Sequence, residues 1–351
     1  MAGIVVAGAG AVGASMAYHL ALAGVHDVVL ADVGEVAGGA TGRAMGGVRQ
    51  QFTTAAEVRL ARASVELFEQ LGPPHFERVG YLFLATTEAG LKELERRREE
   101  QRELGVPVER ADPSEWPELH RDDVLGASIC REDGVADPAG VTRELVRRAA
   151  ALGVDVREQT DALELDAATL VLATGAWSGP IGERLGVELP VRPLVRQLVD
   201  VGPVAGVPPR LPMTIEAEST FHFRRVGADT LRLAMTEPEL RWDGPAEVRD
   251  DLVEDCRARL AFRYPGAAGA PIRRAWAGFY DMTPDAHPII GPVADGVYAA
   301  CGFSGHGFMQ APAVGAAVAA ELLGDAPPFD LSHYRVDRFA AGAVFPERLI
   351  L

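Results

Sequence analysis

The sequence predicts an α/β protein in which a parallel sheet with covering helices is interleaved with a second, antiparallel sheet. The first 32 residues read as a strand, a glycine-rich turn, an amphipathic helix and a second strand. Two further apolar strands end in turns of small residues, at 171–176 and 299–308, and "STFHFRRV" and "DTLRLAMT" alternate like a hairpin. Because parallel strands end at one edge of a sheet, we expect the three small-residue turns to meet.

The first turn has the spacing G-x-G-x-x-G after an apolar strand. Its first glycine makes the turn, its second lets a pyrophosphate approach, and its third packs helix on strand. The helix N-terminus offers unpaired N–H groups to phosphate, and an acid about 20 residues on suits ribose hydroxyls. This context predicts a dinucleotide site formed by Gly8, Gly10, Ala11, Val12, Gly13, Asp32 and Val33.

Two other stretches carry too many glycines for ordinary core packing. The first is "GEVAGGATGRAMGGVRQQF", which follows Asp32, and the second is "ACGFSGHGFM", residues 300–309. Glycine permits positive φ and lets the main chain approach a ligand closely. The alternative is a plain turn between the strand "GVYAAC" and the helix "APAVGAAVAAELL".

Composition limits the possible functions. The 351 residues leave room for about two domains, and 34 basic against 50 acidic residues give a net charge of −16, which argues against nucleic acid or an anionic membrane as partner. Three separate cysteines indicate neither a disulfide framework nor a zinc site and favour the cytosol. No signal peptide or membrane-spanning stretch is expected.

Taken together, these motifs resemble the flavin-dependent family of D-amino acid oxidase, glycine oxidase and sarcosine oxidase, over nearly the whole chain. The carriers are "GAGAVG" with Asp32, "GGATGRAMGGVR", "VLATGAWS", "AGFYDMTPDAHPIIGP", "GFSGHGFMQAPAVG" and "DLSHYRVDRF". Within this family, the sequence most resembles the beta subunits of sarcosine oxidase and of two-subunit proline dehydrogenases. The resemblance implies a Rossmann-type FAD-binding domain (1–80, 135–190 and 272–351) interleaved with an antiparallel-sheet substrate-binding domain (81–134 and 191–271).

The same resemblance implies further contacts to FAD, with the glycine-rich 302–309 loop against the flavin ring. Its glycines would let main-chain N–H groups and the following helix N-terminus reach the ring where negative charge develops on reduction. The additional expected contacts are Thr41, Arg43, Gly46, Gly47, Val156, Thr174, Gly175, Trp177, Gly302, Gly305, His306, Gly307, Phe308 and Met309. The segment 157–170 is shorter than the small β-meander usual in relatives.

The implied reaction is oxidation of a neutral amine, with hydride transfer to the flavin and hydrolysis of the imine. Tyr280 stands where glycine oxidases have an arginine for the substrate carboxylate, and Met309 where monomeric sarcosine oxidases have a lysine. Arg49 is therefore the expected cation, with an ordinary structural ion pair as its alternative. Arg224, Arg225 and Arg232 are reserves, and Gln50, Gln51 and Phe52 are candidate lining residues.

Several other side chains have either a functional or a structural interpretation. Tyr280 is expected either to contact substrate or to be a core aromatic, and His306 is expected at the flavin. His287 is expected to be structural and Cys301 a buried inert thiol. Some relatives attach flavin through a cysteine where this chain has Gly278, so FAD is expected to be non-covalent.

Electron transfer has more than one possible destination. Lys92, the only lysine, lies in a charged helical run, which leaves no lysine to promote reaction with oxygen. The chain is expected to be an amine or amino acid oxidase or dehydrogenase, using O₂ or another acceptor. The alternatives are a flavoprotein subunit that passes electrons to a partner, and a nicotinamide-dependent dehydrogenase. No metal is expected.

Overall fold

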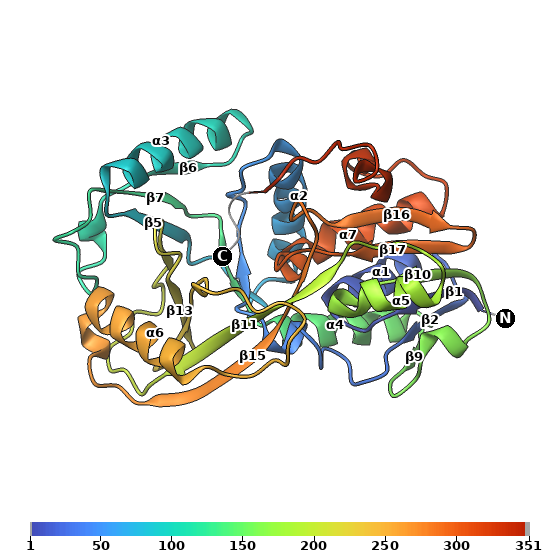
Figure 1. Ribbon diagram of the computed structural model, residues 1–351, viewed down its shortest axis with the longest axis horizontal. Helices are drawn as coiled ribbons and strands as arrows, with labels where there is room; N and C mark the ends of the chain where they lie inside the picture. The colour runs from blue at the N-terminus through green and yellow to red at the C-terminus, as the bar shows by residue number, and fades with distance from the viewer. Residues whose placement is uncertain (1, 348–351) are drawn as a thin grey trace.

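The computed structural model describes residues 2–347, and its first sheet is a six-stranded, mostly parallel one (Figure 1). In spatial order its strands are β16 (Ile289–Ala294), β17 (Val297–Cys301), β10 (Ala167–Leu172), β1 (Ala2–Ala7), β2 (Val28–Ala31) and β9 (Asp155–Arg157). Strands β17, β10 and β1 are parallel neighbours, so their carboxyl ends share one edge. The predicted meeting of three small-residue turns is confirmed.

Helices cover both faces of this sheet. Helices α1 (Ala11–Leu22), α4 (Pro138–Ala151) and α7 (Gly307–Leu322) pack on one face, and α2 (Ala55–Leu71) packs against α7. The short α5 (Ser178–Arg184) and the chain after it cover the other face. Along β1, Val6 belongs to the first core and Val5 and Ala7 to the second, as a strand buried on both faces requires.

The second sheet has eight strands and is largely antiparallel. Their spatial order is β15 (Ile272–Met282), β11 (Arg192–Val201), β14 (Thr230–Ala234), β13 (His222–Val226), β12 (Met213–Glu216), β5 (Tyr81–Ala85), β7 (Gly126–Cys130) and β6 (Val108–Ala111). Helices α3 (Glu88–Glu103) and α6 (Asp250–Arg263) lie at its outer side (Figure 1). The predicted hairpin is β13 with β14.

Small elements join the two sheets. A three-stranded sheet of β3 (Gly47–Val48), β8 (Gly134–Ala136) and β4 (Phe76–Glu77) lies between them in sequence. The long strands β11 and β15 run beside one another from the eight-stranded sheet toward the first sheet (Figure 1). Three-residue helical turns follow at Thr41–Arg43, Pro113–Glu115, Ala162–Glu164, Gly175–Trp177, Pro265–Ala267, Ser332–Tyr334 and Val336–Arg338.

Local sequence explains where several helices start. The hydroxyl of Thr54 accepts from the N–H of Glu57 at the start of α2, and Thr87 does the same for Gly90 at the start of α3. Helix α7 begins at Gly307, four residues before the predicted helix, because residues 307–310 continue into it as a regular first turn. The glycine-rich stretch is thus part loop and part helix N-terminus.

Candidate active site and cofactor cleft

The glycine fingerprint forms a tight backbone cradle between β1 and α1. Gly8 has φ +107°, and a Cβ there would lie 2.4 Å from the Ala173 carbonyl oxygen. A Cβ on Gly13 would lie 1.8 Å from the Gly8 oxygen, so only glycine allows this helix to pack here. A Cβ on Gly10 would be less crowded, with the Thr41 hydroxyl oxygen 3.2 Å away.

The polar groups around this cradle suit a dinucleotide. Helix α1 begins at Ala11 after the N-cap residue Gly10, which has no side chain to cap it, and the Ala11 N–H donates to the Thr41 hydroxyl at 3.0 Å. The carboxylate of Asp32 accepts from the N–H groups of Ala9 (2.7 Å) and Gly34 (2.8 Å). A free helix N-terminus beside a fixed carboxylate is the donor and acceptor set that phosphate and ribose require.

The loop after β2 reaches from this cradle to the second sheet. Arg43 donates to the carbonyls of Gly38 (2.6 Å) and Gly39 (3.0 Å), and its own carbonyl accepts from Trp276 Nε1 at 3.1 Å. Gly46 has φ +81°, and a Cβ there would lie 2.4 Å from the Ala136 carbonyl oxygen. Gly46 is therefore required for close backbone packing at this point of the loop.

The turn after β10 lies beside the fingerprint, as expected. Thr174 and Ser178 share a hydroxyl hydrogen bond of 2.9 Å, and Gly175 has φ +53°. Trp177 is 57% exposed and meets the ring of Phe279 edge-on, with centroids 5.7 Å apart. Val156 lies on the edge strand β9 and is paired with Leu30 on β2. Val33 follows β2 and is exposed.

The 302–309 stretch packs under β15. The N–H groups of Gly302 and Phe303 both donate to the carboxylate of Asp281, at 2.9 and 3.0 Å. A Cβ on Gly305 would lie 2.4 Å from the ring of Tyr280, so this glycine makes room for that ring. The loop's first N–H groups thus bind Asp281, and the α7 N-terminus, which no side chain caps, carries the free donors. Phe308 and Met309 lie in its first turn.

Arg49, just after β3, meets His306 at the N-terminus of α7. Arg49 is 1% exposed, its Nη1 donates to the Gln51 carbonyl, and its Nη2 lies 3.3 Å from His306 Nε2. Because a guanidinium only donates, this ring nitrogen accepts and the His306 proton lies on Nδ1. The guanidinium also lies 4.0 Å from the centroid of Phe52. Burial lowers the pKa of Arg49, against the charges of Tyr81, Glu347 and Asp133.

Asp133, which the sequence did not indicate, holds the residues next to Arg49. It is fully buried and accepts from the Gln50 main chain at 2.9 Å and from the Gln51 side chain at 3.0 Å. Burial raises the pKa of Asp133 to about 6, against the hydrogen bonds of Gln51 and Gln50. Gln50 and Gln51 are thus turned toward this carboxylate.

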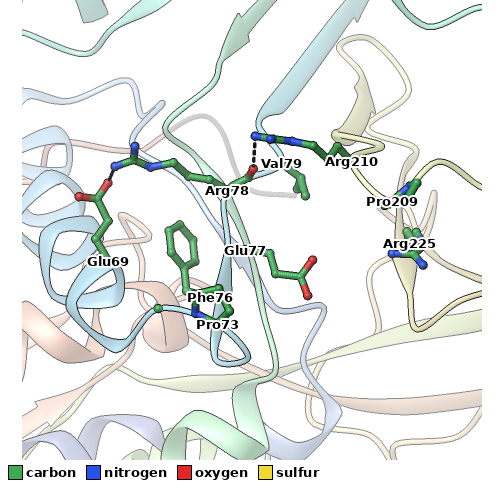
Figure 2. Close-up of a pocket in the computed structure, with 10 residues that line it drawn as sticks. Glu69, Pro73, Phe76, Glu77, Arg78, Val79, Pro209, Arg210 and Arg225 are labelled. Carbon is green, nitrogen blue, oxygen red and sulfur yellow. Dashed lines mark hydrogen bonds and ion pairs between the residues drawn. The ribbon is translucent and has the colours of Figure 1, made fainter.

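Two of the three reserve arginines of the hairpin have structural partners. Arg224 donates to the carbonyl of Met45 at 2.6 Å, and Arg232 forms a two-point ion pair with Asp200 at 2.9 and 3.0 Å. Arg225 lines a surface cavity of about 620 Å³ together with Glu69, Phe76, Glu77, Arg78 and Arg210 (Figure 2). An adjoining cavity of about 590 Å³ includes Arg224 and Arg232 in its wall.

A buried polar network anchors the segment Ala343–Glu347, which we call the C-terminal strap. His287 Nδ1 lies 2.9 Å from Glu57 Oε1, and its Nε2 lies 2.6 Å from the Phe345 carbonyl oxygen, with the Phe345 ring stacked 4.0 Å away. Glu347 is 4% exposed and accepts from the N–H and hydroxyl of Thr53 at 3.0 and 2.8 Å. The strap therefore ends close to Arg49, as its effect on the pKa of that residue requires.

The remaining expectations concern reactive side chains. Cys301 is buried, and burial raises the pKa of its thiol to about 12, as an inert thiol requires. Lys92 is exposed on α3. Within residues 2–347, no group of three or more His, Cys, Asp or Glu side chains is arranged to hold a metal ion.

Comparison with known proteins identifies the family. The DAO profile, described as "FAD dependent oxidoreductase", matches residues 3–321. The chain belongs to this DAO family. FAD-dependent oxidoreductase domain-containing protein 1 of Bos taurus is 30% identical, over 99% of this chain and 87% of that protein. The L-proline dehydrogenase structure from P. horikoshii superposes with a TM-score of 0.90 at 29% identity, covering 98% and 99% of the two chains.

Two other relatives differ in how much of their own length this chain covers. The 4-methylaminobutanoate oxidase (formaldehyde-forming) of Paenarthrobacter nicotinovorans is 26% identical over 96% of this chain, which spans 45% of that protein. Glycine oxidase of Bacillus licheniformis is 27% identical over 92% of this chain and 93% of its own.

As a member of the DAO family, the protein is an FAD-dependent oxidoreductase. The backbone cradle, the Asp32 carboxylate and the helix N-termini fit an extended dinucleotide. None of the helices between residues 2 and 347 is long and apolar enough to cross a membrane.

Proposed function

We propose that the protein oxidises the C–N bond of a secondary or primary amino acid, of the sarcosine, proline or N-methyl type, to an imine. The observation that carries this proposal is the meeting of Arg49, His306 and the β15 residue Tyr280 at the cofactor edge of the first sheet. Relatives named as glycine oxidase, sarcosine dehydrogenase and 4-methylaminobutanoate oxidase support an amine substrate.

Arg49 provides the positive charge for the substrate carboxylate. Its guanidinium is desolvated and oriented by the Gln51 carbonyl, His306 and Phe52, and a desolvated, oriented cation interacts strongly with an anion. His306 accepts from Arg49 and so fixes the direction of its Nη2 group. Tyr280 packs over Gly305 and forms the wall above the loop.

FAD supplies the acceptor for a hydride that leaves the substrate carbon as the nitrogen loses a proton. The imine then reacts with water to give a carbonyl compound and an amine. The residues proposed to hold FAD are Gly8, Gly10, Ala11, Val12, Gly13, Asp32, Val33, Thr41, Arg43, Gly46, Gly47, Val156, Thr174, Gly175, Trp177, Gly302, Gly305, His306, Gly307, Phe308 and Met309.

Anaerobic titration tests this function. The purified yellow protein is mixed with sarcosine, proline and other N-methyl amino acids in both configurations, and the flavin absorbance is followed. Bleaching by at least one amino acid, but not by the matched amine that lacks the carboxylate, is the expected result. If none of these compounds bleaches the flavin, the proposed substrate class is wrong.

The flavin is proposed to be non-covalent. Gly278 stands at the attachment position of some relatives, its built Cβ already approaches Arg43 at 3.2 Å, and the three cysteines are buried. Acid precipitation should therefore release all yellow colour into the supernatant. Colour that stays with the pellet would contradict this and direct attention to Cys301.

A flavoprotein subunit is the second candidate. The chain spans only 45% of 4-methylaminobutanoate oxidase and 41% of sarcosine dehydrogenase from Mus musculus, so further domains accompany this unit in those relatives. The exposed position of Lys92 removes the lysine charge that would promote reaction with oxygen. We therefore propose a cytosolic dehydrogenase that passes electrons to a partner, and turnover of the isolated chain with a dye, faster than with air, tests it.

The division into domains follows the same proposal. The first sheet and its helices, from 1–80, 135–190 and 272–351, hold the cofactor, and 81–134 with 191–271 hold the substrate wall. Residues 272–282 form β15, which pairs with β11 of the eight-stranded sheet, so this strand joins the two units.

A further inference from the structure

Arg196 on β11 is a buried cation without a partner. Arg196 is only 8% exposed, and neither its Nε nor its Nη1 atom has a hydrogen-bond partner among the described residues. No carboxylate of residues 2–347 forms an ion pair with it, whereas Arg224, Arg232 and Arg338 all have polar partners. An unpaired buried charge destabilises a folded protein unless a ligand completes it.

The position of Arg196 places it in the substrate wall. Arg196 is opposite Gly278 in the β11–β15 register, and its guanidinium lies 5.5 Å from the ring centroid of Tyr280. A Cβ on Gly305 would lie 2.4 Å from the same ring, so the 302–309 loop also contacts Tyr280. Arg196 and the loop therefore approach the same aromatic ring.

The charges around Arg196 leave this wall positive. The positive charges of both Arg196 and Arg49 lower the pKa of Tyr280, against the larger effect of burial, which raises it. His222 is 3% exposed, and burial lowers its pKa to about 4, with Arg49 and Arg196 acting in the same direction. His222 is therefore neutral near pH 7. The wall thus carries two cations: Arg196, and Arg49 with the acidic groups of Glu347, Asp133 and Glu57 acting on it.

We propose that Arg196 binds a second carboxylate on the substrate, so that the protein selects amino dicarboxylic acids or their N-alkyl derivatives. This proposal rests on the proposed function, because it assigns the first carboxylate to Arg49. A substrate with two carboxylates pairs with Arg196 while its first carboxylate contacts Arg49, whereas a monocarboxylate leaves Arg196 buried and without an ion-pair partner. The site therefore discriminates through the cost of that unpaired charge.

Binding of two unreactive acids tests the inference without turnover. Succinate and butyrate have the same number of carbons and differ by one carboxylate, and their dissociation constants follow from the shift of the flavin absorbance. We expect succinate to bind the holoenzyme about 10- to 100-fold more tightly. The substitution Arg196→Met should abolish most of this preference and leave butyrate binding within about threefold. Arg274→Met, an exposed position on β15, should leave both constants unchanged.

Stability separates a binding role from a structural one. Because Arg196 has no partner, Arg196→Met should keep its FAD and melt at the same temperature or roughly 1–4 °C higher. A structural ion-pair residue would lower the melting temperature instead. Arg196→Lys keeps the charge without the planar fork and should restore part of the succinate preference. A lower melting temperature together with an unchanged ratio of the two constants overturns the inference.

Reactive compounds distinguish the failure of this inference from the failure of the proposed function. We expect N-methylaspartate to bleach the flavin with a higher kcat/KM than N-methylalanine, and Arg196→Met to remove the difference through KM. If both bleach the flavin equally in the wild type and in the variant, the function holds and the inference is wrong. If neither bleaches it while Arg196→Met still removes the succinate preference, the anion site stands and the amine function fails.

Discussion

The cofactor cradle and the proposed substrate wall differ in which groups form them: main chain in the cradle and side chains in the wall. At the end of the first sheet, Gly8 and Gly13 let main chain approach main chain, and the polar groups presented are mostly backbone N–H groups. The proposed substrate wall consists of single side chains: Arg196 and Tyr280 from the paired strands β11 and β15, and Arg49 from the segment after β3. Binding one conserved cofactor shape requires backbone geometry, whereas substrate choice requires only a few exchangeable side chains.

The largest effect should come from the fingerprint, where two glycines have different tolerances. Gly10→Val meets only the Thr41 hydroxyl, so the chain should fold but bind FAD at least ~100-fold more weakly, because the side chain fills the pyrophosphate's place. Gly13→Val would place a Cβ against the Gly8 carbonyl and should prevent folding. Flavin content and far-ultraviolet circular dichroism measure the two outcomes. A yellow Gly10→Val protein would show that the cradle is misassigned.

A smaller but still large effect is expected at Arg49. Arg49→Met should lower kcat/KM by roughly 30- to 1,000-fold, since truncation of a buried charge partner costs about 2–4 kcal/mol. FAD content should be unchanged, which distinguishes the substrate wall from the cofactor cradle. Steady-state kinetics with the best bleaching substrate provide the measurement. An unaltered kcat/KM would leave Arg49 a structural residue.

The strap gives a pH-dependent effect. Burial lowers the pKa of His287, but the hydrogen bond and charge of Glu57 and the charge of Asp285 outweigh it, so the net pKa is raised. The protonated ring donates to Glu57 and to the Phe345 carbonyl, with Arg338 held by Asp285 beside it. This stabilisation is complete below the unfolded pKa of about 6.5 and is lost as pH rises through the raised folded pKa.

His287→Asn should remove this dependence. The variant leaves the buried Glu57 without its cationic partner and should cost about 3 kcal/mol of unfolding free energy at pH 6, but less at pH 9. Hydrogen exchange of Ala343–Glu347 should become fast in the variant at both pH values. Equal losses at the two pH values would show that His287 is neutral in the folded protein.

The smallest effect concerns oxygen. Met309 is 9% exposed in the first turn of α7, at the position where monomeric sarcosine oxidases have a lysine. Reduced protein should return slowly to the oxidised spectrum in air-saturated buffer, and Met309→Lys should speed this about 10-fold, because a fixed charge stabilises developing superoxide. Stopped-flow absorbance measures both rates. Fast reoxidation of the wild type would exclude the dehydrogenase proposal.

The same difference explains why the cofactor cradle could be predicted from the sequence and most of the proposed substrate wall could not. The cradle was predictable because glycine spacing, strand and helix lie within about 30 contiguous residues, and the three turns met because parallel strands share an edge. Asp133, Glu57, Glu347 and Arg196 carry no such signal, since each acts through residues far away in the chain. Arg196 fits the alternating pattern of an ordinary strand, and only the absence of an ion-pair partner among the described residues distinguishes it. The early start of α7 was hidden because glycine disfavours helix interiors but not first turns.

The exposed helix α3 has a practical consequence. It lies at the outer side of the eight-stranded sheet (Figure 1), its last turn reaches Phe52 through Gln101, and its first half carries Lys92, the only lysine of the sequence. Reagents selective for the lysine ε-amine over the α-amine therefore find a single side chain, which is exposed in the first half of α3. Coupling through Lys92 would attach every molecule to an electrode or bead in the same orientation, with the cofactor half turned toward solution.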